Sequence, residues 1–231
     1  MTVTIIIPCY NELNTIEKLL RKILSLKNYK LQIIIVDDGS IDGTKLILKK
    51  KIFSKSKIIY HKKNKGKGAA INTAKKYVKG DIVIIQDADL EYDPKDYKKI
   101  VQPIFNGEFK VVYGSRFLKK DKDLRYYFNS YFQILGNLFL TFVSNFLNKQ
   151  NLTDAHTCYK AFDSKIFKNI ILKESGFSFC PEITTKVSKM NLRIHEVAIK
   201  YKSRNIKEGK KIRIVDGFHA LYCLIKYRFF T

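Results

Sequence analysis

The sequence lacks the cysteine pattern of a disulfide-stapled or zinc-bound small protein. Its four cysteines, Cys9, Cys158, Cys180 and Cys223, are scattered, and none forms a CxxC pair or another metal-ligand spacing. The N-terminus also lacks the basic start and apolar stretch of a signal peptide. Together these two absences favour a protein of the reducing cytosol.

Residues that interrupt or loosen a fold are scarce as well. Only 4 prolines and 11 glycines occur among 231 residues, and no biased linker divides the chain. Hydrophobic residues make up 45% and aromatic residues 13%, a composition that excludes a disordered chain. Length and composition therefore predict a single domain over residues 1–231, large enough to bury a substantial core.

Acidic residues are scarce relative to basic residues in this sequence. The chain has 44 lysines and arginines against 21 aspartates and glutamates, a formal net charge of +23. This excess suits a nucleic acid, a phosphate-bearing substrate or a lipid headgroup surface. It equally suits a solvated surface, because Lys, Ile and Asn are abundant together, as an AT-biased coding sequence produces. No basic helix with base-reading residues is apparent, so nucleic-acid binding is the least favoured interpretation.

Apolar, β-branched runs alternate with amphipathic segments along the first half of the chain. The predicted strands span residues 2–8, 32–38, 57–62, 81–87 and 111–116. Helices are predicted to begin near Asn14, Asp42, Lys67 and Pro94. Strands without polar alternation, separated by helices, form mostly parallel sheets covered on both faces. The predicted fold class is therefore α/β, with ligands at the carboxyl ends of the strands.

Polar residues follow the first three predicted strands. They are residues 10–12, then Asp37 and Asp38, then the NKGKG segment at 64–68. Neither DDGSIDG nor NKGKGAA has the residue order of a GxGxxG or GxxxxGK[ST] phosphate loop. A simple turn is the alternative interpretation of each segment. Their expected meeting at one edge of the sheet is what favours a binding site.

An acidic cluster follows the fourth predicted strand. In VIIQDADLEYDP, residues 83–94, four carboxylates stand at every second position and repel one another unless a positive group lies among them. Mg²⁺ and Mn²⁺ prefer such oxygen ligands. Because alternate residues of an extended segment share a side, Asp87 and Asp89 are predicted to approach one ion while Ala88 faces away. The alternative is an acidic loop in which Asp93 caps the helix near Pro94.

These segments carry a resemblance to a known family. In order and spacing they resemble glycosyltransferase family 2, and more narrowly its dolichol-phosphate mannose synthase-like branch. The resembling segments are PCYNE (8–12), VDDGSIDGT (36–44), NKGKGAA (64–70), QDADLEYDP (86–94), GSR (114–116), TDAHTCYKAF (153–162), FSFCPEITTKVSKMNLRIHEVAIKYKSR (177–204) and EGKKIRIVDGFHAL (208–221). The resemblance implies a GT-A type nucleotide-sugar-binding fold, a mostly parallel Rossmann-like sheet flanked by helices, with C-terminal amphipathic helices. It also implies a nucleotide-sugar-binding half at 1–116 and an acceptor- and membrane-facing half at 117–231.

The resemblance assigns a donor site. In this family a DxD element holds Mg²⁺ or Mn²⁺ against the diphosphate of a nucleotide sugar, and Asp87-Ala88-Asp89 occupies that place. Glu91 is an implied third metal ligand, but mannose synthases commonly carry glutamine there, so the donor stays open between GDP-mannose and UDP-glucose types. The other implied donor contacts are Pro8, Tyr10, Glu12 and Asp38 near base and ribose, Lys67 near the diphosphate, and Lys210 and Lys211 closing over the donor.

The implied reaction is inverting transfer of the sugar to a polyprenyl or dolichyl phosphate. A phosphate acceptor is already anionic near neutral pH and needs no general base, so the main demand is charge neutralisation. The resemblance places Asp89, Arg116 and Arg204 in this catalytic role. A family 2 transferase with a sugar-hydroxyl acceptor is the alternative, and it requires a carboxylate base such as Asp154.

The second half also contains a long apolar segment, residues 125–147. Every fourth residue in it is polar, which predicts a helix that lies in a membrane interface or packs on the domain, because a spanning helix needs about twenty predominantly apolar residues. These polar residues are Asn129, Gln133, Asn137, Thr141 and Asn145.

The C-terminal stretch 217–231 mixes aromatic residues with Lys226 and Arg228 and is too short to span a bilayer. We therefore expect a peripheral enzyme at the cytosolic face of a membrane, with a membrane protein as a candidate partner. His61, His195 and His219 share no ligand spacing and receive no role.

Overall fold

The central element is a seven-stranded sheet. The computed structural model describes residues 1–118, 131–204 and 214–230. Across these residues the strand order is β3-β2-β1-β4-β6-β5-β7. The strands are β1 (Thr2–Cys9), β2 (Lys30–Asp37), β3 (Lys57–Tyr60), β4 (Ile82–Ile85), β5 (Val111–Ser115), β6 (Lys160–Asp163) and β7 (Ile194–Ala198).

The first four strands run parallel, as predicted. β1 pairs in parallel with β2 and β4, and β2 pairs in parallel with β3. All four side chains of β4 are buried, because helices and loops cover both faces of the sheet. Isoleucine and valine fill this central part, which confirms the predicted mostly parallel α/β sheet.

The second part of the sheet was not predicted in full. β5 matches the predicted fifth strand, but β6 lies between β4 and β5 and is antiparallel to both. β7 then pairs in parallel with β5 and forms the other edge. The segment containing β6 therefore crosses back into the middle of the sheet, which places the loop before it beside the carboxyl end of β4.

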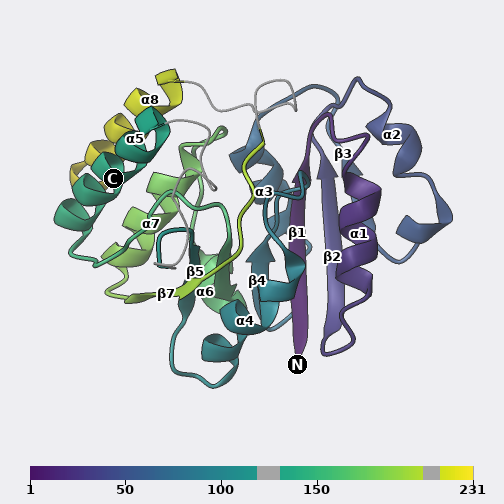
Figure 1. The fold of residues 1–231 in the computed structure, drawn as a ribbon, viewed down its shortest axis with the longest axis horizontal. Helices are drawn as coiled ribbons and strands as arrows, with labels where there is room; N and C mark the ends of the chain where they lie inside the picture. Colours follow the sequence, from purple (N-terminus) through teal and green to yellow (C-terminus); the bar gives the residue numbers. More distant parts are fainter. Residues whose placement is uncertain (119–130, 205–213, 231) are drawn as a thin grey trace.

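Helices surround the sheet. They are α1 (Ile16–Leu24), α2 (Thr44–Ile47), α3 (Lys67–Lys75), α4 (Tyr97–Phe105), α5 (Tyr131–Asn148), α6 (Ser164–Asn169), α7 (Phe179–Lys189) and α8 (Ile214–Phe229), with short 3-10 turns η1 (Lys51–Phe53) and η2 (Pro94–Asp96). α3 packs on β1 and β2, and α4 packs on β5 and β6. Figure 1 shows α5, α7 and α8 together at one end of the molecule and α1 and α2 at the other.

Two helix starts differ from the prediction. α1 begins at Ile16 with Thr15 rather than Asn14 at the N-cap, and the Thr15 hydroxyl donates to Glu12 Oε2 at 2.6 Å instead of capping the helix. The helix expected near Asp42 has only four residues, Thr44–Ile47. Asp93 does take the capping role given as an alternative, since its Oδ1 accepts a hydrogen bond from the Lys95 N–H at 3.1 Å.

The polar stripe of the apolar segment faces inward. Asn145 bonds to Leu152 through both its amide oxygen and its amide nitrogen, and Thr141 is only 4% exposed. The apolar side chains of α5 face outward, as the exposed residues Phe142 and Phe146 show. α5 therefore packs on the domain through its polar side, and Asn129 of the predicted stripe lies outside the described residues.

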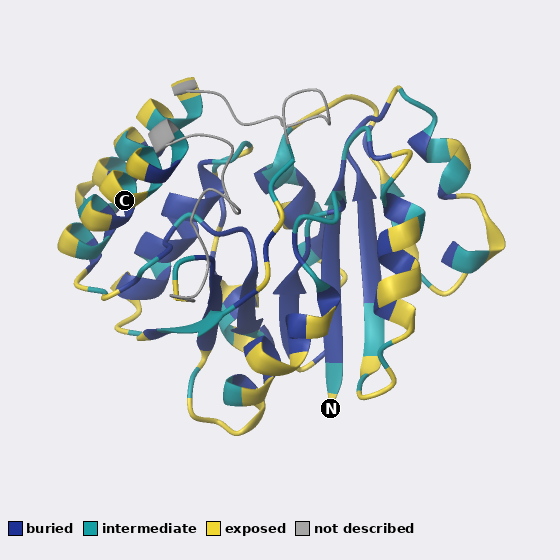
Figure 2. Cartoon of the chain, in the orientation of Figure 1, coloured by how far each residue is buried: buried dark blue, intermediate teal, exposed yellow. Residues whose placement is uncertain are grey.

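α8 lies against α5 and α7 and shares the outward apolar surface. Figure 2 shows exposed residues along the outer sides of α5 and α8. In the residues that the structure describes, neither these helices nor any other meets the length and hydropathy of a membrane span.

Candidate active site

The loops after β1 and β2 form one hydrogen-bonded unit. Asn11 adopts a left-handed backbone conformation with φ of 51°, and its side-chain oxygen accepts a bond from the Ile41 N–H at 2.9 Å. Its own N–H donates to Ser40 Oγ at 2.9 Å. The Glu12 N–H donates to Thr44 Oγ1, also at 2.9 Å. These bonds hold Glu12 at the carboxyl edge of the sheet, buried and 5% exposed.

Asp38 organises the next loop. Its carboxylate accepts bonds from the Lys65 N–H at 3.0 Å and the Gly66 N–H at 2.7 Å, and its Oδ1 lies 2.6 Å from His61 Nδ1. His61 in turn contacts Thr73 Oγ1 at 3.0 Å. His61 therefore belongs to the site, although no motif or spacing in the sequence indicated it. In the structure the Asp38 carboxylate binds His61 and the backbone of Lys65 and Gly66. Its predicted contact with a base or ribose stays a prediction.

Asp37 is the adjacent carboxylate and is fully buried. Neither of its carboxylate oxygens has a hydrogen-bond partner among the described residues within normal distance. Burial raises the pKa of Asp37. Unlike the Asp38 carboxylate, that of Asp37 is left unsatisfied at the carboxyl end of β2.

The GKG turn at the start of α3 needs both of its glycines. Gly66 has φ of +95°, and a Cβ there would lie 2.5 Å from the backbone oxygen of Ser175. A Cβ on Gly68 would overlap the backbone oxygen of Glu174. The turn is therefore pressed against the loop 174–176, and this contact presents Lys67 toward the acidic cluster.

Lys67 pairs with Asp87. Its Nζ forms a largely buried ion pair with Asp87 Oδ1. Burial by itself would lower the pKa of Lys67, but the charge of Asp87 outweighs burial and the pKa is raised. Lys67 therefore stays protonated, and it supplies one of the positive groups that the acidic cluster requires.

Arg204 is the second positive group and lies among three carboxylates. Its Nη1 is 3.1 Å from Glu12 Oε2, and its Nη2 is 3.0 Å from Asp89 Oδ2. Its backbone N–H donates to Glu91 Oε1 at 2.7 Å. Glu12, Asp89, Glu91 and Arg204 come from three distant parts of the chain. The sequence predicted that Glu12 and the acidic cluster share one crevice, and the structure adds Arg204 to them.

The cluster keeps an excess of negative charge. Burial, together with the charges of Asp87 and Glu91, raises the pKa of Asp89 to about 7 against the opposing effect of Arg204. Arg204 thus only partly compensates the carboxylates. Three neighbouring carboxylates with unbalanced charge are the oxygen donor set that a hard divalent cation prefers. Asp87, Asp89 and Glu91 therefore fit Mg²⁺ or Mn²⁺ by their chemistry, but their oxygens are not gathered within 4.8 Å of one another, because Asp87 pairs with Lys67 and Asp89 with Arg204.

The expected extended geometry of the DxD element is wrong. β4 ends at Ile85 and a turn begins at Ala88, so Asp87 and Asp89 do not continue a strand. In the structure Asp87 pairs with Lys67 and Asp89 pairs with Arg204. Ala88 does face away, since it is 3% exposed and belongs to the core.

Glu91 connects the acidic loop to the segment after β7. Its Oε2 accepts a bond from the Tyr201 hydroxyl at 2.7 Å, and its backbone oxygen accepts a bond from the Lys202 N–H at 2.9 Å. With the Arg204 N–H bond, these contacts anchor residues 201–204 beside the cluster. Tyr201 is a site residue that the sequence did not indicate.

Arg116 forms a second, separate ion pair. Its Nε and Nη2 donate to the two carboxylate oxygens of Asp154 at 2.6 and 2.7 Å. Asp154 is completely buried, and it also accepts a bond from the Arg116 N–H at 3.2 Å. The Arg116 guanidinium lies over the ring of Tyr201, 5.0 Å from its centroid. Tyr201 therefore contacts both Arg116 and the carboxylate cluster, and the phosphate-binding role of Arg116 stays a prediction.

The remaining residues predicted to contact the donor are Pro8, Tyr10, Lys210 and Lys211. Pro8 pairs with Val36 in the sheet, and Tyr10 is partly exposed after the end of β1. Both lie at the same edge as the cluster. Lys210 and Lys211 lie outside the described residues.

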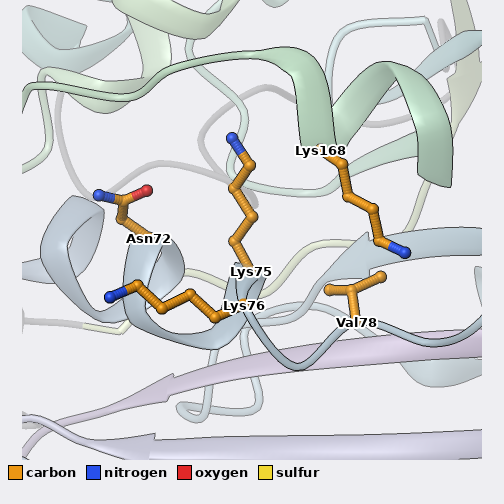
Figure 3. Close-up of a pocket in the computed structure, with 5 residues that line it drawn as sticks. All are labelled: Asn72, Lys75, Lys76, Val78 and Lys168. Atoms are coloured by element: carbon orange, nitrogen blue, oxygen red, sulfur yellow. The ribbon is translucent and has the colours of Figure 1, made fainter.

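A basic hollow elsewhere is not part of this site. It is lined by Asn72, Lys75, Lys76, Val78 and Lys168 (Figure 3). These residues lie near the C-terminal end of α3, whereas Lys67 begins that helix. The hollow therefore opens away from the acidic cluster.

Comparisons with known proteins agree with this geometry. A family model described as glycosyl transferase family 2 matches residues 4–171. The chain is 33% identical over 244 residues to a UDP-N-acetylglucosamine–dolichyl-phosphate N-acetylglucosaminyltransferase of Methanococcus voltae, covering 96% of this chain and 94% of that protein. It is 30% identical over 231 residues to a dolichol-phosphate mannosyltransferase of Pyrococcus furiosus, covering 98% of this chain and 64% of that protein.

Solved structures share the fold. Glucosyl-3-phosphoglycerate synthase from Mycobacterium tuberculosis, in complex with Mn²⁺, UDP and phosphoglyceric acid, matches with a TM-score of 0.75 at 16% identity. The match covers 100% of this chain and 79% of that chain. It confirms the predicted α/β fold of the GT-A type.

Proposed function

The chain belongs to glycosyltransferase family 2, and from this premise we propose that it transfers a sugar from a nucleotide sugar to a polyprenyl phosphate at a membrane surface. The carboxylate cluster around Arg204 carries the proposal, because it joins an excess of buried negative charge to an arginine at the carboxyl edge of a GT-A sheet. The two named relatives act on dolichyl phosphates. Residues 1–116 are assigned to the donor and 117–231 to the acceptor and membrane.

Asp87, Asp89 and Glu91 would hold the divalent cation. Mg²⁺ or Mn²⁺ bound there supplies charge neutralisation for the departing nucleoside diphosphate. Lys67 starts α3 beside Asp87 and adds a fixed positive charge to the same place. Pro8, Tyr10, Glu12 and Asp38 form the nucleoside end of the proposed donor site.

Arg204 has two successive sets of partners in this proposal. Without substrate it neutralises Glu12 and Asp89. With a cation held by Asp87, Asp89 and Glu91, the Arg204 guanidinium would be available to bind phosphate oxygens, for which its planar fork of donors is suited. Arg204 thereby offsets part of the negative charge of the cluster and would offer a positive charge when both anionic substrates are present.

Arg116 receives the acceptor phosphate. Its bidentate pair with Asp154 fixes the plane of the guanidinium. Asp154 in this role orients Arg116 and takes no proton. The acceptor oxygen, already ionised, attacks the anomeric carbon from the side opposite the departing diphosphate, which inverts the configuration.

A bilayer surface is the proposed partner of α5 and α8. Their outward side chains are large and apolar, and the most exposed are Leu135, Phe139, Phe142, Phe146, Val215, Phe218, Tyr222 and Phe229, followed by Phe230 just after α8. A patch of this size on one face of a water-soluble protein marks an interaction site. Arg228 on α8 adds positive charge suited to anionic headgroups at the cytosolic face, whereas Lys226 is paired with Glu174.

The alternative with a sugar-hydroxyl acceptor requires a carboxylate that takes a proton. Asp154 is the residue weighed for this role, and both of its carboxylate oxygens are bound by Arg116. No other observation at the site favours this alternative over a phosphate acceptor.

The decisive experiment follows sugar transfer into a lipid phase. The protein is incubated with Mn²⁺ or Mg²⁺, liposomes containing a polyprenyl phosphate, and UDP-N-acetylglucosamine, UDP-glucose or GDP-mannose in separate reactions. The proposal expects a glycolipid with at least one donor, far less of it with the Asp89→Asn variant, and none with liposomes lacking the polyprenyl phosphate. Efficient transfer to a soluble sugar, without glycolipid from any donor, would overturn it.

A further inference from the structure

A second group of potential ligands lies at the opposite end of the molecule from α1 and α2. Glu174 belongs to the loop before α7, and His219 and Cys223 belong to α8. One potential ligand atom from each of the three lies within 4.8 Å of the others. His219 and Cys223 are four residues apart on one helix and therefore share a face, a spacing also used by helical zinc ligands.

The distances between the atoms approach those of a zinc site. His219 Nε2 is 3.8 Å from Glu174 Oε2 and 3.9 Å from Cys223 Sγ. Tetrahedral zinc with ordinary bond lengths places such ligand atoms about 3.4–3.6 Å apart. Closing these distances by about half an ångström requires only side-chain adjustment.

The ligands are also held in the manner of metal ligands. His219 Nδ1 lies 2.7 Å from Ser178 Oγ, a contact that fixes the ring and directs Nε2 toward the other two groups. Glu174 Oε1 accepts bonds from Lys226 Nζ at 3.0 Å and from the Tyr227 hydroxyl at 2.7 Å. These bonds orient Glu174 so that Oε2 faces His219.

We propose that Glu174, His219 and Cys223 form a Zn²⁺ site that is separate from the donor site. A thiol and an imidazole select zinc, whereas the all-carboxylate set at Asp87 and Asp89 selects Mg²⁺ or Mn²⁺. The His219 side chain is 53% exposed and gives the ion an entry path from solvent. With three protein ligands, the fourth position falls to a water molecule.

Two costs limit the affinity of this site. Lys226 brings a positive charge to the carboxylate that the ion must share. Burial raises the pKa of the Cys223 thiol to about 11, so zinc must displace a proton from it. The site is therefore weaker than a four-ligand structural zinc site.

Zinc bound here would fasten α8 to the loop that supports Lys67. The backbone oxygen of Ser175 accepts a bond from the Ala69 N–H at 3.0 Å, in the first turn of α3. The Glu174 N–H donates to Glu182 Oε2 at 2.8 Å, in α7. The ion would thus link α8 to a segment already bound to both α7 and α3.

The test measures metal binding directly, in an Asp89→Asn background that weakens the donor site. The full chain is stripped with a chelator, and Zn²⁺ binding is measured by calorimetry. Co²⁺ is added in a parallel experiment, because a thiolate ligand produces a charge-transfer band in the near ultraviolet. We expect one Zn²⁺ per chain, a thiolate–Co²⁺ band, and a higher unfolding temperature with Zn²⁺.

Three variants decide the outcome. His219→Ala and Cys223→Ser should each weaken Zn²⁺ binding at least about tenfold, and Cys223→Ser should remove the Co²⁺ band. His195→Ala, a histidine outside the cluster, should bind as the parent does. If Cys223→Ser fails to fold, the His219→Ala variant alone provides the test, because the exposed His219 side chain can be removed with little effect on folding. Zn²⁺ binding that His219→Ala leaves unchanged, or no binding by the parent, would overturn the site.

Discussion

The carboxyl edge of β1, β2 and β4 and the outer surface of α5 and α8 distribute polarity in opposite ways. At the sheet edge, apolar strands form the interior and charged groups such as Asp89 and Arg204 gather toward the crevice. On α5, polar side chains such as Thr141 and Asn145 face the domain, and Phe142 faces outward. The first region suits water and ions outside it, and the second suits an apolar medium.

The regular spacing of polar and apolar residues along a helix therefore does not by itself determine which side of the helix packs against the domain. Asn137 and Asn145 face inward because their side chains form hydrogen bonds with buried polar groups of the domain. Asn137 Nδ2 donates to Asp154 at 3.3 Å, and Asn145 pairs with the Leu152 backbone. The apolar residues are then left outside, where burial against lipid would compensate for their exposure.

The largest effect is expected at the charged edge. Asp89→Asn should lower sugar transfer about a thousandfold, because it removes a charged ligand from the cation and the diphosphate. The fold should persist, since the variant relieves repulsion with Asp87 and Glu91 and retains an oxygen for the Glu91 N–H bond. Transfer kinetics and thermal unfolding measure the two quantities. Asp93→Asn is the matched control and should keep nearly full activity.

Removing Arg204 should test whether a bound cation can take over the charge neutralisation that Arg204 provides to the carboxylates. Arg204→Met should lower transfer about a hundredfold, because a charge-assisted contact to phosphate is lost. Its unfolding temperature in chelator should fall, since Glu12, Asp89 and Glu91 then repel without compensation.

Added Mn²⁺ should raise the unfolding temperature of Arg204→Met more than that of the parent protein, because the ion replaces the missing charge. Lys202→Met, which removes a neighbouring side-chain charge, is the control. Equal stabilisation of the variant and the parent by Mn²⁺ would contradict the exchange.

A smaller effect is expected on the apolar surface. Phe142→Ser should weaken binding to anionic liposomes about tenfold, because a phenyl group no longer enters the lipid interface. Its stability should change little, since Phe142 is 69% exposed. Sedimentation with liposomes measures binding. Leu46→Ser, an equally exposed residue on α2, should bind as the parent does. Equal loss in both variants would show that α5 is not the contact surface.

The smallest effect is expected at Glu91. Glu91→Gln should change the preference between Mg²⁺ and Mn²⁺, or between donors, by a few-fold, because one charge leaves the cluster. The amide oxygen can still accept from the Tyr201 hydroxyl or the Arg204 N–H, so stability should stay close to the parent value. Kinetics with each metal and donor measure the change. Identical kinetics in all combinations would remove Glu91 from the site.

Several features of this protein were determined by local sequence alone. Isoleucine-rich runs without polar alternation predicted the parallel strands β1, β2 and β4, because only a sheet covered on both faces buries such segments. The acidic residues after β4 and the glycines around Lys67 indicated the binding edge. These patterns concern neighbouring residues, whose turn chemistry and burial depend little on the rest of the chain.

Tertiary structure alone decided which charges meet. Arg204 lies 192 residues from Glu12 and 115 from Asp89, and Arg116 finds Asp154 through the return of β6 into the sheet. His61, Tyr201 and the group formed by Glu174, His219 and Cys223 joined their partners in the same way. Local energies set the period of a segment and the position of a turn, but the partner of a buried charge depends on how distant segments cross, because long-range contacts form only once the whole core is packed.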